Sequence, residues 1–281
     1  MRGRSRVLVT GATGTTARAL VPELLRHGVA VTAASRHPSA AVGAEAVELD
    51  WYAPETHDSA LRDAHSVYLV PPPLDPDPAS VMVPFLQRAR LQGMRRAVLL
   101  SASVIPAGGP ASGKVHEALA DIFEEWTVLR PSWFMQNFTG DHFHAVGLRE
   151  TGRIVTATGT GRVGFIDAAD IASVAARALT GEALADRELL LTGPEALSYG
   201  DVAEIYGDVT GRQTVHEAVD QGSVEQRLSG VMAPEAAGML ARLDTLVGSG
   251  AEDRVTDTVE RITGRSPLDL RTVLERELAR Q

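Results

Sequence analysis

A glycine pattern near the start of the chain, V-L-V-T-G-A-T-G-T-T-A over residues 7–17, constrains the fold more than any other feature. A short run of β-branched residues ends at Gly11, a second glycine follows at Gly14, and the small Ala17 stands where a helix would begin. In a strand–turn–helix unit, the first glycine makes the turn, the second lets backbone N–H groups approach a pyrophosphate, and the small residue lets the helix pack closely on the strand. The pattern predicts a dinucleotide-binding unit, with a tight turn that binds no ligand as the alternative. The expected contacts come from Thr10, Gly11, Thr13, Gly14, Thr15 and Thr16.

The end of the second predicted strand indicates which dinucleotide binds. This strand, Val29–Ala34, runs into Ser35 and Arg36, about 25 residues after Gly11. An NAD site usually offers an acidic side chain to the ribose 2′-hydroxyl here, whereas a guanidinium suits a 2′-phosphate. We therefore expect NADP(H) as the cofactor; the alternative is that Arg36 is an ordinary solvated loop arginine.

Composition excludes several other classes of protein. The chain has 281 residues and a net charge of −9 at pH 7, which argues against binding to nucleic acid or to an anionic membrane. It has no cysteine, so disulfides, cysteine-ligated zinc and a cysteine nucleophile are excluded. The basic start resembles that of a signal peptide, but the apolar run breaks at Thr10, and no stretch approaches the roughly 18 apolar residues of a membrane span. We expect a cytoplasmic protein, and the sequence leaves open whether it is a monomer or a homodimer.

Strands and helices alternate through the first part of the chain. This order is typical of the α/β class, with a Rossmann-type, doubly wound parallel sheet whose ligands bind at the carboxyl ends of the strands. The loops that begin after these strands should therefore converge on one site. The strands are expected at residues 7–10, 29–34, 46–49, 66–70, 97–100, 127–129 and 189–191.

The last third of the chain is predicted to be mostly helical. Helices without intervening strands cannot extend a parallel sheet. We expect a smaller helical lobe that binds substrate, residues 193–281, after a nucleotide-binding domain, residues 1–192, which includes a substrate-side loop region at 130–160. The helices of this lobe are expected at residues 199–210, 224–229, 234–247, 253–263 and 267–280.

The catalytic pair of the ordinary short-chain dehydrogenases is missing. Those enzymes protonate the substrate with a tyrosine whose pKa is lowered by a lysine four residues later. The sequence has one lysine, Lys114, and Pro110 stands four residues before it. Reduction of a ketone produces an alkoxide that needs a proton donor in the transition state. An ordinary alcohol or ketone dehydrogenase is therefore disfavoured.

Two kinds of substrate escape that requirement. An iminium carbon that accepts a hydride becomes a neutral amine, with no proton transfer in the step. A quinone or an activated alkene gives a delocalised anion that water or a weak acid can protonate. His116, shortly after the fifth strand, is the candidate donor in that case, with a histidine that faces solvent at a helix start as the alternative.

Several segments resemble the NmrA-like, atypical short-chain dehydrogenase/reductases. These are T-G-A-T-G-T-T-A at 10–17, S-R at 35–36 and L-R-P-S-W-F-M-Q-N-F at 129–138. Three further segments, at 108–116, 193–199 and 251–267, resemble the festuclavine/agroclavine dehydrogenase type of ergot alkaloid reductase and its bacterial relatives. The resemblance covers nearly the whole chain. It implies NADPH-dependent reduction without the tyrosine–lysine pair. In the ergot enzymes the group reduced is an iminium. The resemblance does not identify the substrate of this protein.

The resemblance also implies roles for individual residues. Arg36 would meet the 2′-phosphate, and Asp50 and Trp51 the adenine, unless Asp50 is only a strand-end cap. The remaining cofactor contacts would come from Val70, Pro71 and Pro72 at the ribose and from Ser101, Ala102 and Pro131 at the nicotinamide. The substrate pocket would be formed by Ser103, Trp133, Phe134, Asn137 and Phe138, of which Trp133 and Phe134 are core residues in the alternative interpretation.

The leading hypothesis is an NADPH-dependent reductase of an iminium, quinone or activated alkene in a small, largely apolar metabolite. The alternatives are a non-catalytic redox sensor that binds NADP(H), and a cyclase or isomerase that reuses the cofactor fold. The segment D-H-F-H, with His142 and His144, suggests a pocket rim rather than a metal site. Histidines two residues apart do not share a helix face, and no third ligand is evident.

Overall fold

The computed structural model describes residues 6–38, 43–181 and 187–280, so the basic start of the chain lies outside the described residues. Two compact units are present. The first comprises Met1–Pro131 and Ala168–Leu191, and the second Ser132–Asp167 and Thr192–Gln281. From the sequence we expect the loop region 130–160 to belong to the nucleotide-binding domain. In the structure most of this region belongs to the second unit, because its short elements pack on elements that come later in the chain.

The first unit is built on a seven-stranded sheet with the order β3-β2-β1-β4-β5-β6-β9, in which every neighbouring pair is parallel. This confirms the Rossmann-type, doubly wound parallel sheet predicted from the sequence. The order changes direction at β1, which lies between β2 and β4. The strands are β1 (Arg6–Val9), β2 (Ala30–Ser35), β3 (Glu45–Glu48), β4 (Ser66–Leu69), β5 (Arg96–Leu100), β6 (Glu125–Pro131) and β9 (Glu188–Leu191).

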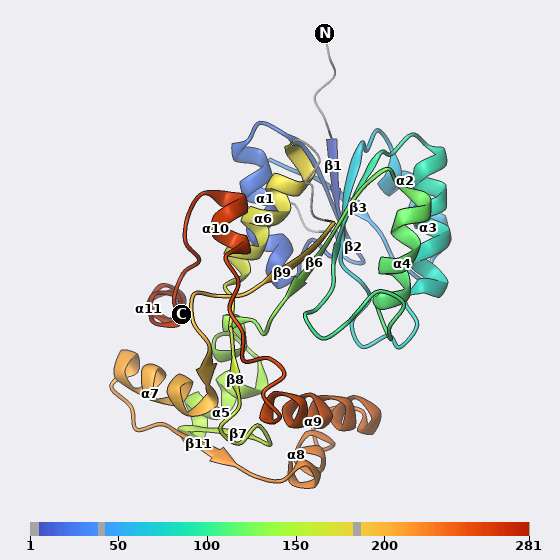
Figure 1. The fold of residues 1–281 in the computed structure, drawn as a ribbon. Helices are drawn as coiled ribbons and strands as arrows, with labels where there is room; N and C mark the ends of the chain where they lie inside the picture. Colours follow the sequence, from blue (N-terminus) through green and yellow to red (C-terminus); the bar gives the residue numbers. More distant parts are fainter. Residues whose placement is uncertain (1–5, 39–42, 182–186, 281) are drawn as a thin grey trace. The chain divides into compact units, whose positions relative to one another are not determined.

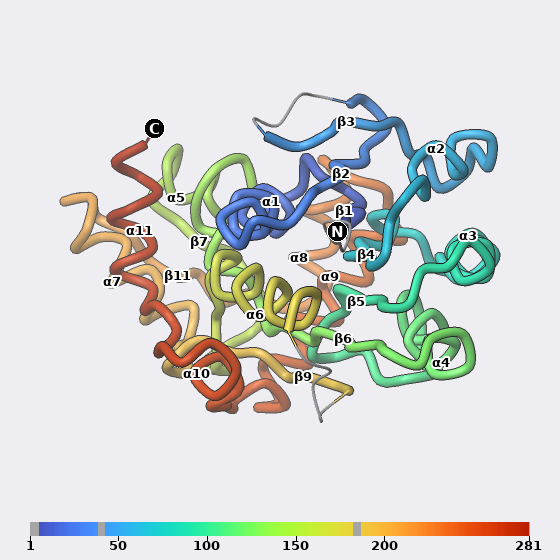
Figure 2. Tube along the Cα trace, turned by 90° about the horizontal axis from the view of Figure 1, so that it is seen from above, coloured from blue at the N-terminus to red at the C-terminus, as the bar shows by residue number. Residues whose placement is uncertain are grey.

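Helices cover both faces of this sheet. Seen from above, α1 and α6 lie against one face, and α2, α3 and α4 against the other (Figure 2). The central strands β1 and β4 are buried along most of their length, which explains their continuous apolar runs. The helices of this unit are α1 (Thr15–Arg26), the 3-10 turn η1 (Pro54–Thr56), α2 (His57–Leu61), α3 (Ala79–Leu91), α4 (Gly113–Ile122) and α6 (Ala168–Thr180).

The second unit combines helices with two small sheets (Figure 1). Helices α8 and α9 pack side by side, and α7 packs against α11. Its elements are η2 (Met135–Phe138), α5 (Phe143–Thr151), β7 (Arg153–Thr156), β8 (Arg162–Val163), β10 (Leu197–Ser198), α7 (Tyr199–Thr210), β11 (Val215–Ala218), α8 (Gln221–Leu228), α9 (Pro234–Gly248), α10 (Thr258–Thr263) and α11 (Leu270–Leu278).

The sequence analysis expects this region to be mostly helical, and the structure adds short strands between its helices. Strand β11 pairs in parallel with β7, about 60 residues earlier in the chain, and β10 pairs with the two-residue strand β8. Such long-range pairing leaves no local signal in four residues of sequence. Residues 253–257 are also not helical, so α10 begins only at Thr258. None of the helices within the described ranges is long and apolar enough to cross a membrane.

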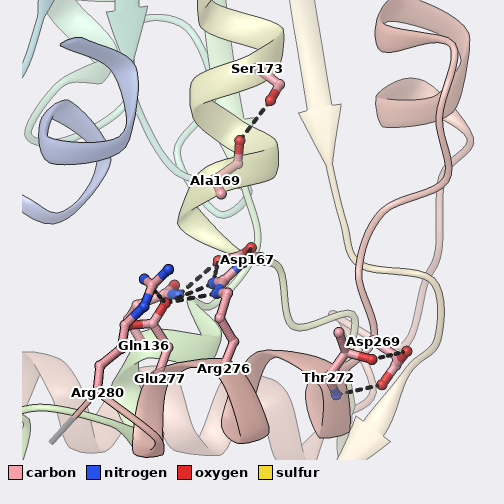
Figure 3. A network of polar contacts seen from close by, with 9 residues as sticks. All are labelled: Gln136, Asp167, Ala169, Ser173, Asp269, Thr272, Arg276, Glu277 and Arg280. Carbon is pink, nitrogen blue, oxygen red and sulfur yellow. Dashed lines mark hydrogen bonds and ion pairs between the residues drawn. The ribbon is translucent and has the colours of Figure 1, made fainter. Parts of the chain in front are cut away.

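A buried ion pair fastens the last helix of the second unit. The Asp167 side chain is fully buried, and both of its oxygens accept hydrogen bonds from the Arg276 guanidinium on α11, at 2.9 and 3.0 Å (Figure 3). Gln136 of η2 donates a further hydrogen bond to Asp167 at 2.8 Å. The N-cap of the same helix is Asp269, whose carboxylate accepts hydrogen bonds from the backbone N–H and hydroxyl of Thr272.

We expect the substitution Arg276→Ala to lower the free energy of unfolding by about 3 kcal/mol, because it leaves a buried carboxylate without its cation. The value lies at the low end for a buried pair, since the arginine side chain itself is 27% exposed. Urea denaturation followed by circular dichroism measures the change. The control is Arg280→Ala, two residues after the end of α11, whose side chain is 67% exposed in its ion pair with Glu277 and which should change stability by less than about 0.5 kcal/mol. Equal effects of the two substitutions would contradict the prediction.

Candidate cofactor and substrate site

The turn after β1 has the geometry that its glycines predict. Gly11 adopts φ +59°, in the left-handed region that favours glycine, and a Cβ placed there would lie 3.1 Å from the Cβ of Val70. A Cβ at Gly14 would lie 3.1 Å from the carbonyl oxygen of Gly11. The backbone therefore lies close to Val70, just after β4, at Gly11, and close to the Gly11 carbonyl at Gly14. Thr13, Gly14 and Thr15 are exposed.

The first turn of α1 presents backbone donors. Its first backbone hydrogen bond runs from Arg18 N–H to the Gly14 carbonyl, so the N–H groups of Thr15, Thr16 and Ala17 have no acceptor within the helix. Gly14 has no side chain that could cap them. Together with the positive end of the helix dipole, these groups form a site for an anion such as a pyrophosphate.

Thr10 anchors the turn to the next strand of the sheet. Its N–H donates to the Tyr68 carbonyl at 3.0 Å, and its hydroxyl accepts from the Val70 N–H at 2.8 Å. Tyr68, fully buried, donates its hydroxyl to Thr16 at 3.1 Å at the start of α1. Burial raises the pKa of Tyr68, so this hydroxyl stays protonated. Thr10 and Thr16 thus hold the turn in place from within.

The strands beside β1 end near this turn. Ala12 N–H donates to the Ala34 carbonyl of β2 at 3.0 Å, which fixes the turn against the end of that strand. Ser35 is buried and donates its hydroxyl to the His37 carbonyl at 2.9 Å. Arg36 follows it and is exposed, with no ion pair to an acidic side chain among the described residues. A guanidinium at this strand end is available to an anionic ligand.

Asp50 and Trp51, which follow β3, occupy different environments. Trp51 is 8% exposed, packs edge-on against Phe85 with ring centroids 5.1 Å apart, and donates its indole N–H to the Val70 carbonyl at 3.2 Å. Asp50 is half-buried, and its carboxylate accepts from the Tyr52 N–H at 3.0 Å. Trp51 is therefore mainly a core residue, while Asp50 shapes the loop.

The remaining predicted contacts follow β4, β5 and β6. Val70, Pro71, Ser101 and Ala102 are half-buried, whereas Pro72, Ser103 and Pro131 are buried. Ser103 N–H donates to the Pro131 carbonyl at 2.8 Å and joins these two loops. The sheet topology thus brings the predicted cofactor residues of the first unit to one edge, as expected for parallel strands.

His116 lies in the interior of the first unit, on α4. Its side chain is 2% exposed, and its Nε2 lies 3.4 Å from a carboxylate oxygen of Glu188. Burial lowers the pKa of His116, outweighing the opposite influence of Glu188. Its predicted role as proton donor stays a prediction. Lys114 is exposed and forms an ion pair with Asp77 at 3.0 Å.

Of the predicted pocket residues, Trp133 and Asn137 line a hollow of about 100 Å³ within the second unit. Phe138 is fully buried and packs edge-on against Phe165 at 5.1 Å, so it belongs to the core. Phe134 is half-buried and pairs through its backbone with Ile166. A larger hollow of about 560 Å³ shares part of the same lining. The hollow of about 100 Å³ is lined by Trp133, Asn137, His142, Phe143, His144, Val155, Tyr199, Val224, Leu228, Leu240, Leu243 and Asp244.

The smaller hollow contains His142 and His144, which the sequence predicts at a pocket rim, and also Tyr199 and Asp244, which the sequence did not indicate. Burial lowers the pKa of His142 to about 4 and that of His144 well below its usual value, so both rings are neutral near pH 7. Burial raises the pKa of Tyr199, and the nearby Asp244 adds to this. Burial also raises the pKa of Asp244 to about 6. Only the D-H-F-H segment gave a signal for any of these residues.

Comparison with known proteins identifies the family. Residues 11–182 match a family of NAD(P)H-binding proteins. The chain is 41% identical over 271 residues to the uncharacterised oxidoreductase YesF of Bacillus subtilis, covering 96% of this chain and 94% of that protein. It is 40% identical over 272 residues to agroclavine dehydrogenase of Claviceps purpurea, covering 93% of each. The chain belongs to this NAD(P)H-binding oxidoreductase family.

Membership in this oxidoreductase family confirms the expected enzyme class, cofactor and family resemblance. The chain is an NAD(P)H-dependent enzyme that binds the cofactor through a domain matched over residues 11–182, and the resemblance to the agroclavine/festuclavine branch holds along nearly the whole sequence. The fold agrees with that of an NADPH-dependent quinone oxidoreductase from Escherichia coli solved with NADPH. Its TM-score is 0.81 at 21% identity, and the match covers 96% of this chain and 99% of that one.

We expect Gly11→Ala to weaken NADPH binding by about tenfold or more, because the added Cβ meets Val70 and strains the turn that presents the anion site. Quenching of protein fluorescence on NADPH titration measures the affinity. Gly28→Ala is the matched control, since Gly28 also has a positive φ, of 73°, but a Cβ there meets nothing within 4 Å. The control should lose stability and keep its NADPH affinity; a similar loss of affinity in both variants would refute the local explanation.

Proposed function

We propose that this enzyme uses NADPH to reduce an iminium or imine carbon, or an activated alkene or quinone, in a small and largely apolar metabolite. The observation that carries this proposal is an intact dinucleotide turn in a chain without a tyrosine four residues before its single lysine. The relatives named agroclavine dehydrogenase and festuclavine dehydrogenase, at 40% and 34% identity, support the same chemistry.

The chemistry follows from what the first unit can and cannot supply. When bound, the reduced nicotinamide supplies a hydride. A ketone that accepts it needs a proton from the enzyme, and the usual donor pair is missing. A hydride that adds to an iminium carbon brings two electrons with it. The π electrons of the C=N bond then move to nitrogen and cancel its positive charge, so the product is an uncharged amine. A substrate of this kind needs from the protein only binding, orientation and exclusion of water.

We propose the cofactor contacts as follows. The N–H groups at the start of α1 bind the pyrophosphate, and Thr10 and Thr16 keep this turn in position. Arg36 binds the 2′-phosphate and sets the preference for NADP(H) over NAD(H). The residues after β5 and β6, namely Ser101, Ala102 and Pro131, support the nicotinamide. Trp133 and Asn137 contribute to the substrate side.

We expect Arg36→Ala to weaken NADPH binding by about tenfold and to leave NADH binding nearly unchanged, because only NADPH carries the phosphate that the guanidinium pairs with. Titration of each cofactor with the purified protein measures both affinities. Arg26→Ala is the control: Arg26 is also exposed, but it lies at the far end of α1 and pairs with Glu23. If NADPH and NADH affinities fall equally in the Arg36 variant, Arg36 does not read the phosphate.

The reaction itself is tested by NADPH oxidation with a panel of cyclic iminium ions, quinones and simple ketones, with NADH as control. We expect turnover with iminium ions or quinones and not with the ketones, and deuterium from 4-deuterated NADPH should appear on the former iminium carbon. Tight NADPH binding without turnover of any acceptor would instead support a sensor of the NADP(H) pool.

A further inference from the structure

The smaller hollow of the second unit contains one carboxylate without a cationic partner. Asp244 lies on α9, and its Oδ2 accepts the Ala157 N–H at 2.9 Å. Among the described residues, no lysine, arginine or histidine forms an ion pair with it within 4 Å, and its other oxygen has no hydrogen-bond donor. By contrast, Asp167 in the same unit forms an ion pair with Arg276. Partial burial of a charged carboxylate without a cation raises the free energy of the folded protein, unless a bound ligand supplies the cation.

The position of Asp244 in its helix increases the negative potential. It stands four residues before the end of α9 at Gly248, next to the carbonyl groups that form the negative end of the helix dipole. A carboxylate at this end of a helix is unfavourable by itself and becomes favourable beside a positive charge. Arg153 and Arg227 line the larger hollow and not the smaller one.

The other walls suit an organic cation. Trp133, Phe143 and Tyr199 contribute aromatic rings, and Val155 and Leu243 add apolar surface. Aromatic faces attract a positively charged nitrogen that carries carbon substituents, and such rings with an acid are typical of ammonium-binding sites. A volume of about 100 Å³ accommodates a charged nitrogen with its nearest carbons. A metal ion is not favoured, because the described residues contain no cluster of three metal-ligating side chains.

We propose that the smaller hollow binds the positively charged nitrogen of an organic substrate, with the Asp244 carboxylate as its counter-ion. This rests on the proposed function and selects, among its substrate classes, the iminium over the quinone. Asp244 is a specificity residue that binds charge, and no proton transfer is assigned to it.

Because the Asp244 carboxylate titrates, cation binding in the smaller hollow should depend on pH. The raised pKa of Asp244, about 6, means that the carboxylate is charged at pH 8 and largely neutral at pH 5. Of the histidines near it, His142 has a pKa of about 4 and stays largely uncharged between these values. Burial also lowers the pKa values of His144 and His216. Tyr199 stays protonated because burial raises its pKa.

The test uses the full chain saturated with NADP⁺ and two probes of one ring size, N-methylpiperidinium and the uncharged N-methyl-2-piperidone. Isothermal titration calorimetry measures their affinities at pH 8. The wild type should prefer the cation, and Asp244→Asn should weaken cation binding at least tenfold while the lactam affinity is unchanged. The amide oxygen of asparagine can still accept the Ala157 N–H, so the local structure is kept. Asp244→Glu should retain the preference for the cation.

Glu235→Gln is the matched control, because it removes the same charge from the exposed first turn of α9, away from the hollow. Cation affinity of the wild type should also fall about tenfold from pH 8 to pH 5, and that of Asp244→Asn should not. Equal binding of the cation by wild type and Asp244→Asn, or no preference for the cation in the wild type, would overturn the proposal.

The same proteins separate this proposal from the proposed function. If Asp244→Asn loses cation binding but the wild type oxidises NADPH with no acceptor, the cation site stands and the reductase fails. If quinones are reduced equally by the wild type and Asp244→Asn while neither protein binds the cation, the reductase stands and the cation site fails.

Discussion

Parallel pairing on both sides of β1 is the constraint on which the first unit depends. β2 and β4 lie on either side of β1, and both pair with it in parallel. The segments that connect these strands therefore leave the carboxyl end of β1 uncovered. Gly11 allows the sharp turn there, and Thr10 ties it to β4 through hydrogen bonds to Tyr68 and Val70. The first N–H groups of α1 are thereby left without acceptors in the helix, which is the arrangement proposed to bind the pyrophosphate.

Two aspartates of the second unit show how environment decides the role of a carboxylate. Asp167 is fully buried, receives two hydrogen bonds from Arg276 and one from Gln136, and joins η2 to α11. Asp244 is half-buried, receives one backbone hydrogen bond and has a pKa raised to about 6. The first is fully satisfied inside the protein and stabilises it. The second retains an unpaired charge beside aromatic rings, which is the condition for binding a ligand.

The chemistry of the proposed reaction follows from an absence in the sequence. The single lysine, Lys114, is exposed and forms an ion pair with Asp77, and no tyrosine stands four residues before it in the sequence. His116, the candidate proton donor, is buried beside Glu188. An acceptor that needs no proton, such as an iminium carbon, fits these residues better than a ketone.

The sequence by itself determined the first unit and the class of cofactor. Strand periodicity, the glycines at 11 and 14 and Arg36 are local signals, because turn geometry and helix termini depend on neighbouring residues. Only the tertiary structure decided the second unit. Strands β7 and β11 have four residues each and exist because they pair over a long distance in sequence. The hollow around Asp244 likewise combines η2, α5, α7, α8 and α9, so no single segment carries its pattern. Whether a polar side chain is paired or unpaired depends on such distant neighbours, and the fold alone fixes them.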